Sequence, residues 1–448
     1  MHESLLAQLK KAFADRRLYL VGGAVRDELL GRVTQDLDLA TDCRPEETQA
    51  RVSDWADSVW AVGEKFGTIG LEKDGAKAEI TTFRADTYDG SDRHPTVTYG
   101  SDILEDLARR DFTINALAKD LHSGEVVDPY DGRSDLQANL VRFVGEPQAR
   151  IKEDPLRLLR AVRFCAQLGF SLEDAAEKAI RELAAEIPRI SWERIRDEYD
   201  AILLSPNAGK GIKLLIELGL AHHTLPEMEK MRLPQNVHHL KDVLEHTLES
   251  VDLVAADKTL RWVMLLHDIA KPATFSEDEN GIHFYRHEEV GASMAREILT
   301  RLRQPTDFSA RVQNLIRHHL RITFYQPEWS DAAVRRLMYD LGADFEAAVQ
   351  AAKADVEASH IIPEDDFPAR LANLLERVAS IGEAAELAKM KPLLNGEEVM
   401  ALLKIGPGPV IGKVQRFLLS EQIEGRIKTA EQAKKSVLER FSSTGEAP

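Results

Sequence analysis

The sequence predicts an α+β fold in which a small head with a mixed sheet precedes an elongated, all-α remainder. In the first ~135 residues, short β-like runs at 18–21 (LYLV), 36–40 (DLDLA) and 79–84 (EITTFR) alternate with helical stretches. From about residue 136, apolar residues recur at spacings of three and four, as in helices with one buried face. No self-similarity at 20–50 residues is visible, which argues against a solenoid. Segregated strands and helices are typical of the α+β class.

Breaks in the helical pattern divide the chain into four predicted parts. Proline and glycine cluster at 204–209, which places a boundary near residue 205, and two prolines with three acidic residues interrupt the helices at 361–370. The predicted parts are a head over 1–135, a neck over 136–205, a body over 206–370 and a tail over 371–448. In the tail, a turn-rich segment at 405–412 precedes an apolar stripe of Val414, Phe417 and Leu418, for which we expect core packing.

Composition excludes several classes of protein. The 448 residues include 58 Lys and Arg and 75 Asp and Glu, so the net charge is −17. This charge argues against a general nucleic-acid coat, but RNA bound through a local basic stripe stays possible. Two cysteines, Cys43 and Cys165, give no disulfide framework and fit a reducing cytosol. Residues 1–17 are typical of an amphipathic helix rather than a secretory signal, and no apolar run approaches the ~20 residues of a membrane span. We therefore expect a cytoplasmic protein without membrane partners.

A glycine turn follows the first predicted strand. In LYLVGGAVRDELLG, Gly22 and Gly23 separate the strand from a helix that carries Arg26 and Asp27. Glycine lets a backbone approach a phosphate closely, and a helix N-terminus offers free N–H groups. Arg26 in the first helical turn is suited to bind a phosphate oxygen. The alternative is an ordinary tight turn without a ligand.

Two carboxylates follow on the next predicted strand. Alternate residues of a strand share a face, so Asp36 and Asp38 point the same way while Leu37 and Leu39 face the core. Oxygen ligands on a rigid strand suit Mg²⁺, and pairs of such ions serve phosphoryl transfer. Glu79, on a later strand-like run, is a candidate third carboxylate. The alternative is an exposed acidic strand face.

Five motifs in order carry a family resemblance. GGAVRD, DLDLA, EITTFR, RRDFTINALA and EDPLRLLRAVRF span residues 22–164 and resemble the nucleotidyltransferase superfamily, specifically class II tRNA CCA-adding enzymes and bacterial poly(A) polymerases. The resemblance implies a catalytic head, a neck with the nucleotide template and a tail that contacts RNA. It implies addition of CCA to tRNA 3′ ends from CTP and ATP by two-metal phosphoryl transfer.

The resemblance also implies roles for particular residues. Asp36 and Asp38 would hold Mg²⁺, and Glu79 would lie near the attacking hydroxyl. The remaining implied positions bind the nucleotide: Gly22, Gly23, Arg26, Asp27, Arg110, Asp111, Asn115, Glu153, Asp154, Arg157, Arg160 and Arg163. Without the family, Arg110 and Asp111 could equally form a surface ion pair.

Asp154 and Arg157 are the implied template for base selection. Residues three apart can lie together at the first turn of a helix. A carboxylate accepts from an exocyclic amino group and a guanidinium donates to the adjacent ring acceptor, which suits cytosine and adenine but not uracil and guanine. Glu153 would orient Arg157. The alternative is simple capping, with Asp154 before Pro155 at a helix start.

Two further features belong to this reading. Arg157, Arg160 and Arg163 recur every three residues, which predicts a cationic stripe toward the triphosphate and RNA, or else a solvated helix face. The loop at 86–101 resembles the family's mobile element for the switch from C to A addition and keeps roughly full length, although one of two expected arginines is His94.

Histidines in the body resemble a second family, the HD metal-dependent phosphohydrolases, over about 236–360. The resemblance implies one ion bound by His246, His267, Asp268 and Asp355, and a second ion completed by His287 and His318. Imidazole and carboxylate ligands accept a divalent transition metal or Mg²⁺. A lone helical histidine is otherwise most often structural.

The rival hypotheses share parts of this evidence. CC-adding, A-adding and poly(A) polymerase activities use the same head motifs. In a second alternative the chain is chiefly an HD phosphohydrolase whose head only binds RNA, and in a third it is a noncatalytic RNA scaffold. The sequence does not give the oligomeric state.

Overall fold

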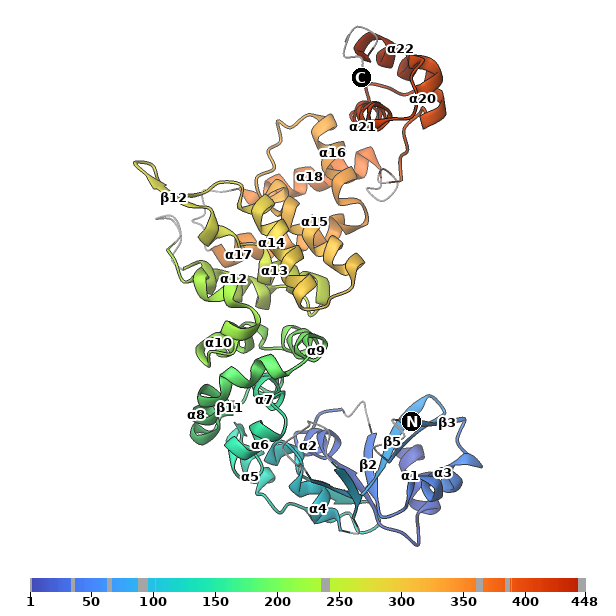
Figure 1. Cartoon of the computed structure of the whole chain (residues 1–448), viewed down its shortest axis with the longest axis vertical. Helices are drawn as coiled ribbons and strands as arrows, with labels where there is room; N and C mark the ends of the chain where they lie inside the picture. Colours follow the sequence, from blue (N-terminus) through green and yellow to red (C-terminus); the bar gives the residue numbers. More distant parts are fainter. Residues whose placement is uncertain are drawn as a thin grey trace. The chain divides into compact units, whose positions relative to one another are not determined.

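A computed structural model gives the structure of the chain, which divides into two compact units, Met1–Pro226 and Glu227–Pro448 (Figure 1). The predicted α+β class is confirmed. The residues that the structure describes are 2–33, 37–62, 67–87, 96–100, 102–234, 242–359, 366–382, 387 and 389–441. Asp36 and most of the predicted mobile loop lie outside them.

A seven-stranded mixed sheet forms the centre of the head, in the order β3-β4-β5-β2-β1-β8-β9. Its strands are β1 (Leu18–Val21), β2 (Leu37–Thr41), β3 (Ser58–Val62), β4 (Thr68–Lys73), β5 (Ala76–Thr82), β8 (Ala118–Asp120) and β9 (Val126–Val127). Only the β2–β5 pair is parallel among these described strands. The three predicted strands are therefore present, and two of them, β2 and β5, are direct neighbours.

Helices and a small hairpin surround this sheet. They are α1 (His2–Ala12), α2 (Gly23–Leu29), α3 (Pro45–Ser53), β6 (Arg84–Thr87), β7 (Thr96–Tyr99), α4 (Ile103–Ala108), the 3₁₀ turn η1 (Thr113–Asn115) and α5 (Gly132–Ala138). One apolar cluster of the head joins Val21 and Ala40 of the sheet to Phe83 and Leu107. This packing fixes the strand ends that carry the predicted site.

The neck continues the same unit. Its elements are α6 (Pro147–Glu153), α7 (Arg157–Leu168), α8 (Asp174–Leu183), α9 (Trp192–Leu203), α10 (Ala208–Glu217) and α11 (Ala221–Thr224), with a short parallel pair of β10 (Leu140–Val141) and β11 (Ser171–Leu172).

The structure moves the boundary predicted near residue 205. Helix α10 packs on α7 and α9. A Cβ at Gly211 would lie 2.6 Å from the Ile202 side chain and 2.9 Å from that of Ala166, so glycine permits the close approach. The proline and glycine cluster is a tight turn inside one unit, which ends at Pro226.

The second unit is mainly helical. Its elements are α12 (Val243–Leu253), α13 (Lys258–Leu266), the hairpin of β12 (Phe275–Asp278) and β13 (Gly281–Phe284), α14 (His287–Arg301), α15 (Thr306–Thr323), α16 (Asp331–Leu341), α17 (Phe345–Ser359) and α18 (Phe367–Ile381). The hairpin departs from the expected all-α pattern. Helix α13 is buried from Thr259 to Leu266, so it is surrounded by packed helices, as its mainly apolar sequence requires.

The tail has its own small core. Helices α20 (Gly396–Leu403), α21 (Pro409–Ile423) and α22 (Ala430–Phe441) enclose buried Val414 and Leu418, and Phe417 packs against them, so the predicted core packing is confirmed. The segment predicted as a turn at 405–412 is partly helical, because Pro409 occupies the first position of α21, where a missing N–H costs nothing. Among the described residues, no helix is long and apolar enough to span a membrane.

Candidate active site and histidine metal centre

Two predicted carboxylates lie side by side on the parallel strand pair. Asp38 of β2 is the Cα partner of Glu79 on β5, and the neighbours of both along their strands are buried while they are exposed. The side chains thus leave the same face of the sheet, as the alternation predicted. Closely spaced exposed oxygen ligands fit a hard cation such as Mg²⁺. Asp36, the other predicted ligand, lies outside the described residues.

The glycine turn is built for close approach to an arginine. Gly22 has φ 64° and its N–H donates to Leu117 O at 3.1 Å. A Cβ at this position would lie 2.6 Å from Nη1 of Arg110. Arg110 is held in turn by Asp106, a carboxylate that is 1% exposed, through a bond of 3.1 Å. The motif therefore positions a guanidinium directly against the turn.

A hydrogen-bond chain connects the glycine turn to the neck. Arg26 donates to Asp27 at 2.9 Å and to Asn115 Oδ1 at 2.7 Å. Asn115 Nδ2 donates to Asp111 Oδ1 at 3.2 Å. Arg160 of α7 donates to the other oxygen of Asp111 at 2.7 and 2.5 Å. These residues are thus gathered in one place, as predicted from their motifs.

Asp111 is a buried acid with a strong partner. Burial by itself raises the pKa of Asp111, but the Arg160 guanidinium and the hydrogen bonds of Asn115 and Phe112 outweigh it, so the pKa is below its ordinary value. The alternative of an ion pair between Arg110 and Asp111 is wrong, since each pairs with another residue.

The arginine stripe of α7 is largely neutralised. Arg163 pairs with buried Glu198 of α9 at 3.0 Å. Burial raises the pKa of Glu198, and the Arg163 and Arg160 charges oppose this. The ring of Phe164 lies among three guanidinium carbons, at 4.8 Å from that of Arg163, 5.4 Å from that of Arg26 and 5.6 Å from that of Arg160. This arrangement is neither a solvated face nor a bare cationic stripe.

The structure places the residues of the predicted template at the junction of α6 and α7. Arg157 is 7% exposed and donates to Glu153 at 2.6 Å, so Glu153 orients it as expected. Asp154 does not begin α7. It ends α6, and its carboxylate accepts from Leu156 N at 3.1 Å, while α7 starts at Arg157. The Asp-Pro step is therefore a turn between two helices, and Asp154 pairs with Arg194.

The second unit contains a buried cluster of histidines and carboxylates. His246, His267 and Asp355 offer ligand atoms within 4.8 Å of one another, and so do Asp268, His287 and His319. His246 comes from α12, His287 from α14, His319 from α15 and Asp355 from α17, while His267 and Asp268 follow α13. Helices far apart in sequence thus build one site.

The histidine rings are held with Nε2 toward the cluster. Nδ1 contacts a backbone carbonyl in His267 (Met264 O, 2.8 Å), His287 (Phe284 O, 2.8 Å) and His319 (Ile316 O, 2.6 Å). Such contacts orient metal-binding imidazoles. Nε2 of His287 and of His319 is buried without a hydrogen-bond partner among the described residues. Buried unpartnered nitrogens beside carboxylates fit divalent cations.

The carboxylates of the histidine cluster favour positive charge on the groups around them. Burial lowers the pKa of His267, but the carboxylates of Asp268 and Asp355 outweigh burial and raise it to about 10. Lys271, which the sequence analysis did not select, contacts Asp268 at 2.7 Å. Lys271 lies three residues after Asp268, and this spacing in the sequence could have predicted the ion pair.

The predicted ligand His318 is corrected to its neighbour. His319 is 4% exposed and joins the cluster, whereas His318 lies among Arg321, Asp340 and Arg336. Successive residues on a helix point about 100° apart, so only one of two adjacent histidines can face the same centre.

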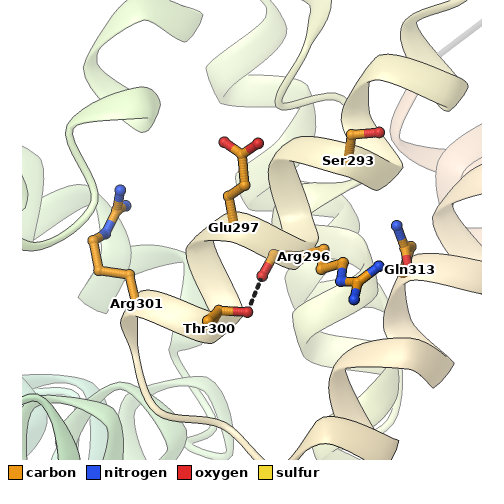
Figure 2. Close-up of a pocket in the computed structure, with 6 residues that line it drawn as sticks. All are labelled: Ser293, Arg296, Glu297, Thr300, Arg301 and Gln313. Atoms are coloured by element: carbon orange, nitrogen blue, oxygen red, sulfur yellow. Dashed lines mark hydrogen bonds between the residues drawn. The ribbon is translucent and has the colours of Figure 1, made fainter.

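A separate hollow lies on α14 and α15. It has a volume of about 630 Å³ and is lined by Ser293, Arg296, Glu297, Thr300, Arg301 and Gln313 (Figure 2). None of these residues belongs to either predicted site. The hollow is therefore distinct from the histidine cluster.

Strand carboxylates beside a glycine turn, a helical neck with an oriented arginine and a histidine–aspartate cluster are typical of a nucleotidyltransferase fused to an HD domain. Three families match consecutive regions: "Poly A polymerase head domain" at 18–142, "Probable RNA and SrmB- binding site of polymerase A" at 169–231 and "HD domain" at 236–338. An A-adding tRNA nucleotidyltransferase of Deinococcus radiodurans is 37% identical over 93% of both chains. The chain thus belongs to the tRNA nucleotidyltransferase family of CCA-adding and A-adding enzymes.

Other relatives match in part or in fold. A CCA-adding enzyme of Geobacillus thermodenitrificans is 45% identical over 45% of this chain and 49% of its own length. The crystal structure of the Bacillus stearothermophilus CCA-adding enzyme with CTP covers 98% of this chain and 96% of its own, with a TM-score of 0.70 and 26% identity. The Thermotoga maritima CCA-adding enzyme complexed with tRNA shares the fold, with a TM-score of 0.55 and 20% identity over 97% and 93% of the chains.

Gly22→Ala should impair nucleotide addition, because the added methyl group displaces the Arg110 guanidinium from the turn. Gly31→Ala is the matched control, since Gly31 has φ 67° with no atom within 4 Å of its Cβ position. Both variants should lose stability from backbone strain, and Gly22→Ala should lose more, because a φ of 64° with a ψ of −129° lies outside the left-handed α region. Only Gly22→Ala should also lose about a hundredfold in kcat/KM. Equal activities of the two variants would contradict the role of the close approach.

His319→Ala should weaken metal binding while His318→Ala should not. Because bound metal stabilises the folded state, titration with Mn²⁺ or Ni²⁺ should stabilise wild type and His318→Ala by about 2.7 kcal/mol at about 100 times Kd. Thermal unfolding and metal content of the purified variants check this. A larger loss of the metal effect in His318→Ala would refute the ligand assignment.

Proposed function

We propose that the enzyme adds C, C and A to tRNA 3′ ends from CTP and ATP. The observation that carries this proposal is the oriented Arg157 beside Asp154 on the neck, in the same unit as the strand carboxylates. One such pair suits both cytosine and adenine, because both bases offer an amino group next to a ring acceptor. The CTP complex of the Bacillus stearothermophilus enzyme, similar over 98% of this chain, supports the use of CTP.

The residues of the head divide the chemistry between them. Asp36 and Asp38 would hold Mg²⁺, with Glu79 at hand beside Asp38. Bound Mg²⁺ supplies charge neutralisation at the triphosphate and activation of the 3′-hydroxyl. Gly23 and the N-terminus of α2 would offer backbone N–H groups to phosphate oxygens, while the N–H of Gly22 is used by Leu117 O. Arg26 and Arg110 add positive charge there, and their partners Asn115 and Asp106 hold them in place.

Base selection follows from fixed donors and acceptors on the neck. Arg157 is committed to Glu153 and to two backbone carbonyls, those of Arg150 and Arg109. A guanidinium held this way cannot turn to suit a different base. Uracil and guanine would place a carbonyl oxygen against the Asp154 carboxylate, and a buried unpaired acceptor costs about 1–3 kcal/mol.

A-adding activity is the second candidate. The Deinococcus radiodurans relative, matched over 93% of this chain, is named an A-adding enzyme, and the similarity includes the HD domain. An A-adding enzyme needs the same carboxylates and the same template. The two candidates differ only in whether CTP is used on shorter acceptors.

The HD domain would supply a second activity, hydrolysis of phosphate esters at damaged RNA ends. Divalent ions bound at its cluster supply Lewis-acid activation of water and of the phosphate. His246, His267, Asp268 and Asp355 would hold one ion, with His287 and His319 available for another. Lys271 would stabilise the Asp268 carboxylate and add positive charge near a phosphate.

The enzyme should extend tRNA that ends at the discriminator base, at C or at CC. Incubation of each acceptor with labelled CTP or ATP counts the nucleotides added. Full CCA addition predicts extension of all three acceptors. Extension of tRNA-CC alone, with ATP, would instead establish the A-adding candidate.

Asp38→Ala should lower addition by at least about a thousandfold and leave tRNA binding intact, because the carboxylate acts on the reacting groups. Glu72→Ala is the control, an acid on β4 of the same sheet. Gel-shift affinity and labelled incorporation measure the two effects. Undiminished addition by Asp38→Ala would refute the metal assignment.

A further inference from the structure

The template carboxylate is held from another helix. Arg194 of α9 donates to Asp154 through both terminal nitrogens, Nη2 to Oδ2 at 2.7 Å and Nη1 to Oδ1 at 3.3 Å. The two residues are 40 positions apart in the chain. No motif of the sequence analysis included Arg194. The contact therefore gives Asp154 a second tether besides the backbone N–H of Leu156.

The contacts with Arg194 and Leu156 leave part of the Asp154 carboxylate available to accept a hydrogen bond from a ligand. An ionised carboxylate has about four lone-pair positions, two on each oxygen. Oδ1 of Asp154 already accepts from Leu156 N and from Arg194 Nη1. Oδ2 accepts from Arg194 Nη2. One position on Oδ2 is left, enough for one further donor.

Helix α9 is itself anchored beside the template. Glu198 lies four residues after Arg194 on the same helical face and pairs with Arg163 of α7 at 3.0 Å. Glu198 is 6% exposed, whereas the side chain of Arg194 is 35% exposed. The buried pair fixes α9 against α7, and the more exposed pair lies where a ligand can reach it.

We propose that Arg194 is a positioning residue for base selection. It holds the Asp154 carboxylate so that its remaining acceptor position on Oδ2 meets the exocyclic amino group of an incoming cytosine or adenine. Arg194 acts on the base through Asp154 and Arg157 acts on it directly. The inference rests on the proposed function, because it assumes that Asp154 contacts the base.

The fixed orientation matters because a free carboxylate can rotate. Without Arg194, the Asp154 carboxylate would keep the hydrogen bond from Leu156 N and could rotate away from a uracil or guanine carbonyl. The free-energy penalty for binding these two bases would then fall. Loss of the Arg194 charge should also weaken binding of every triphosphate. A ratio of kcat/KM values between two nucleotides cancels that shared effect.

The test measures selectivity in Arg194→Ala and in two companion variants. The ratio of kcat/KM for ATP to that for GTP on tRNA-CC should fall by about tenfold or more, since one oriented acceptor contributes on the order of 1–3 kcal/mol. Arg194→Lys keeps the charge and one donor, and should restore part of the ratio. Arg196→Ala, on the same helix, should keep the wild-type ratio.

A combined variant separates positioning from other roles. If Arg194 acts only through Asp154, Asp154→Ala with Arg194→Ala should have the same ratio as Asp154→Ala alone. A wild-type ratio in Arg194→Ala would overturn the inference, and so would a further loss in the combined variant. Wild-type enzyme that extends no acceptor would overturn the proposed function and this inference with it. Wild-type selectivity that survives in Arg194→Ala would overturn the inference alone.

Discussion

The ion pair between buried Asp111 and partly exposed Arg160 is the contact on which the candidate active site depends. Asp111 directly follows Arg110 in the head, and Arg160 lies on α7 of the neck. The ion pair therefore joins the neck to the head. Asp111 also orients Asn115, which orients Arg26 at the glycine turn. A buried acid and its guanidinium are stable only together, since either alone would be an uncompensated charge. The predicted template residues and the strand carboxylates are thereby held in one unit.

The chain combines two kinds of candidate metal site that differ in their chemistry. The carboxylates of β2 and β5 are exposed and supply hard oxygen ligands, which suit a hydrated Mg²⁺ that also meets a triphosphate. The histidine cluster is buried, with backbone carbonyls that fix the ring orientations. Imidazole-rich, enclosed ligand sets favour transition metals. The two sites therefore favour different cations.

Sequence reasoning succeeded where the relevant residues share one element. The alternation of DLDLA placed Asp38 outward between buried leucines. It failed where a partner comes from elsewhere in the chain. Arg194 pairs with Asp154, 40 positions away, and Glu198 pairs with Arg163 of another helix.

Two errors have a local physical origin. Adjacent histidines at 318 and 319 cannot both face one centre, and the sequence alone does not say which face of α15 is buried. The boundary near residue 205 came from a turn that resembles a linker, yet Gly211 lets the next helix pack tightly on the neck.

A double-mutant cycle on Asp111 and Arg160 tests whether this ion pair supports nucleotide addition. The measured quantity is kcat/KM for AMP addition to tRNA-CC in wild type, Asp111→Ala, Arg160→Ala and the double variant. We expect the double variant to be no worse than either single variant, with a coupling free energy of about 2 kcal/mol. Losses that multiply, within about 0.5 kcal/mol of additivity, would show that the two residues act separately and would contradict the account.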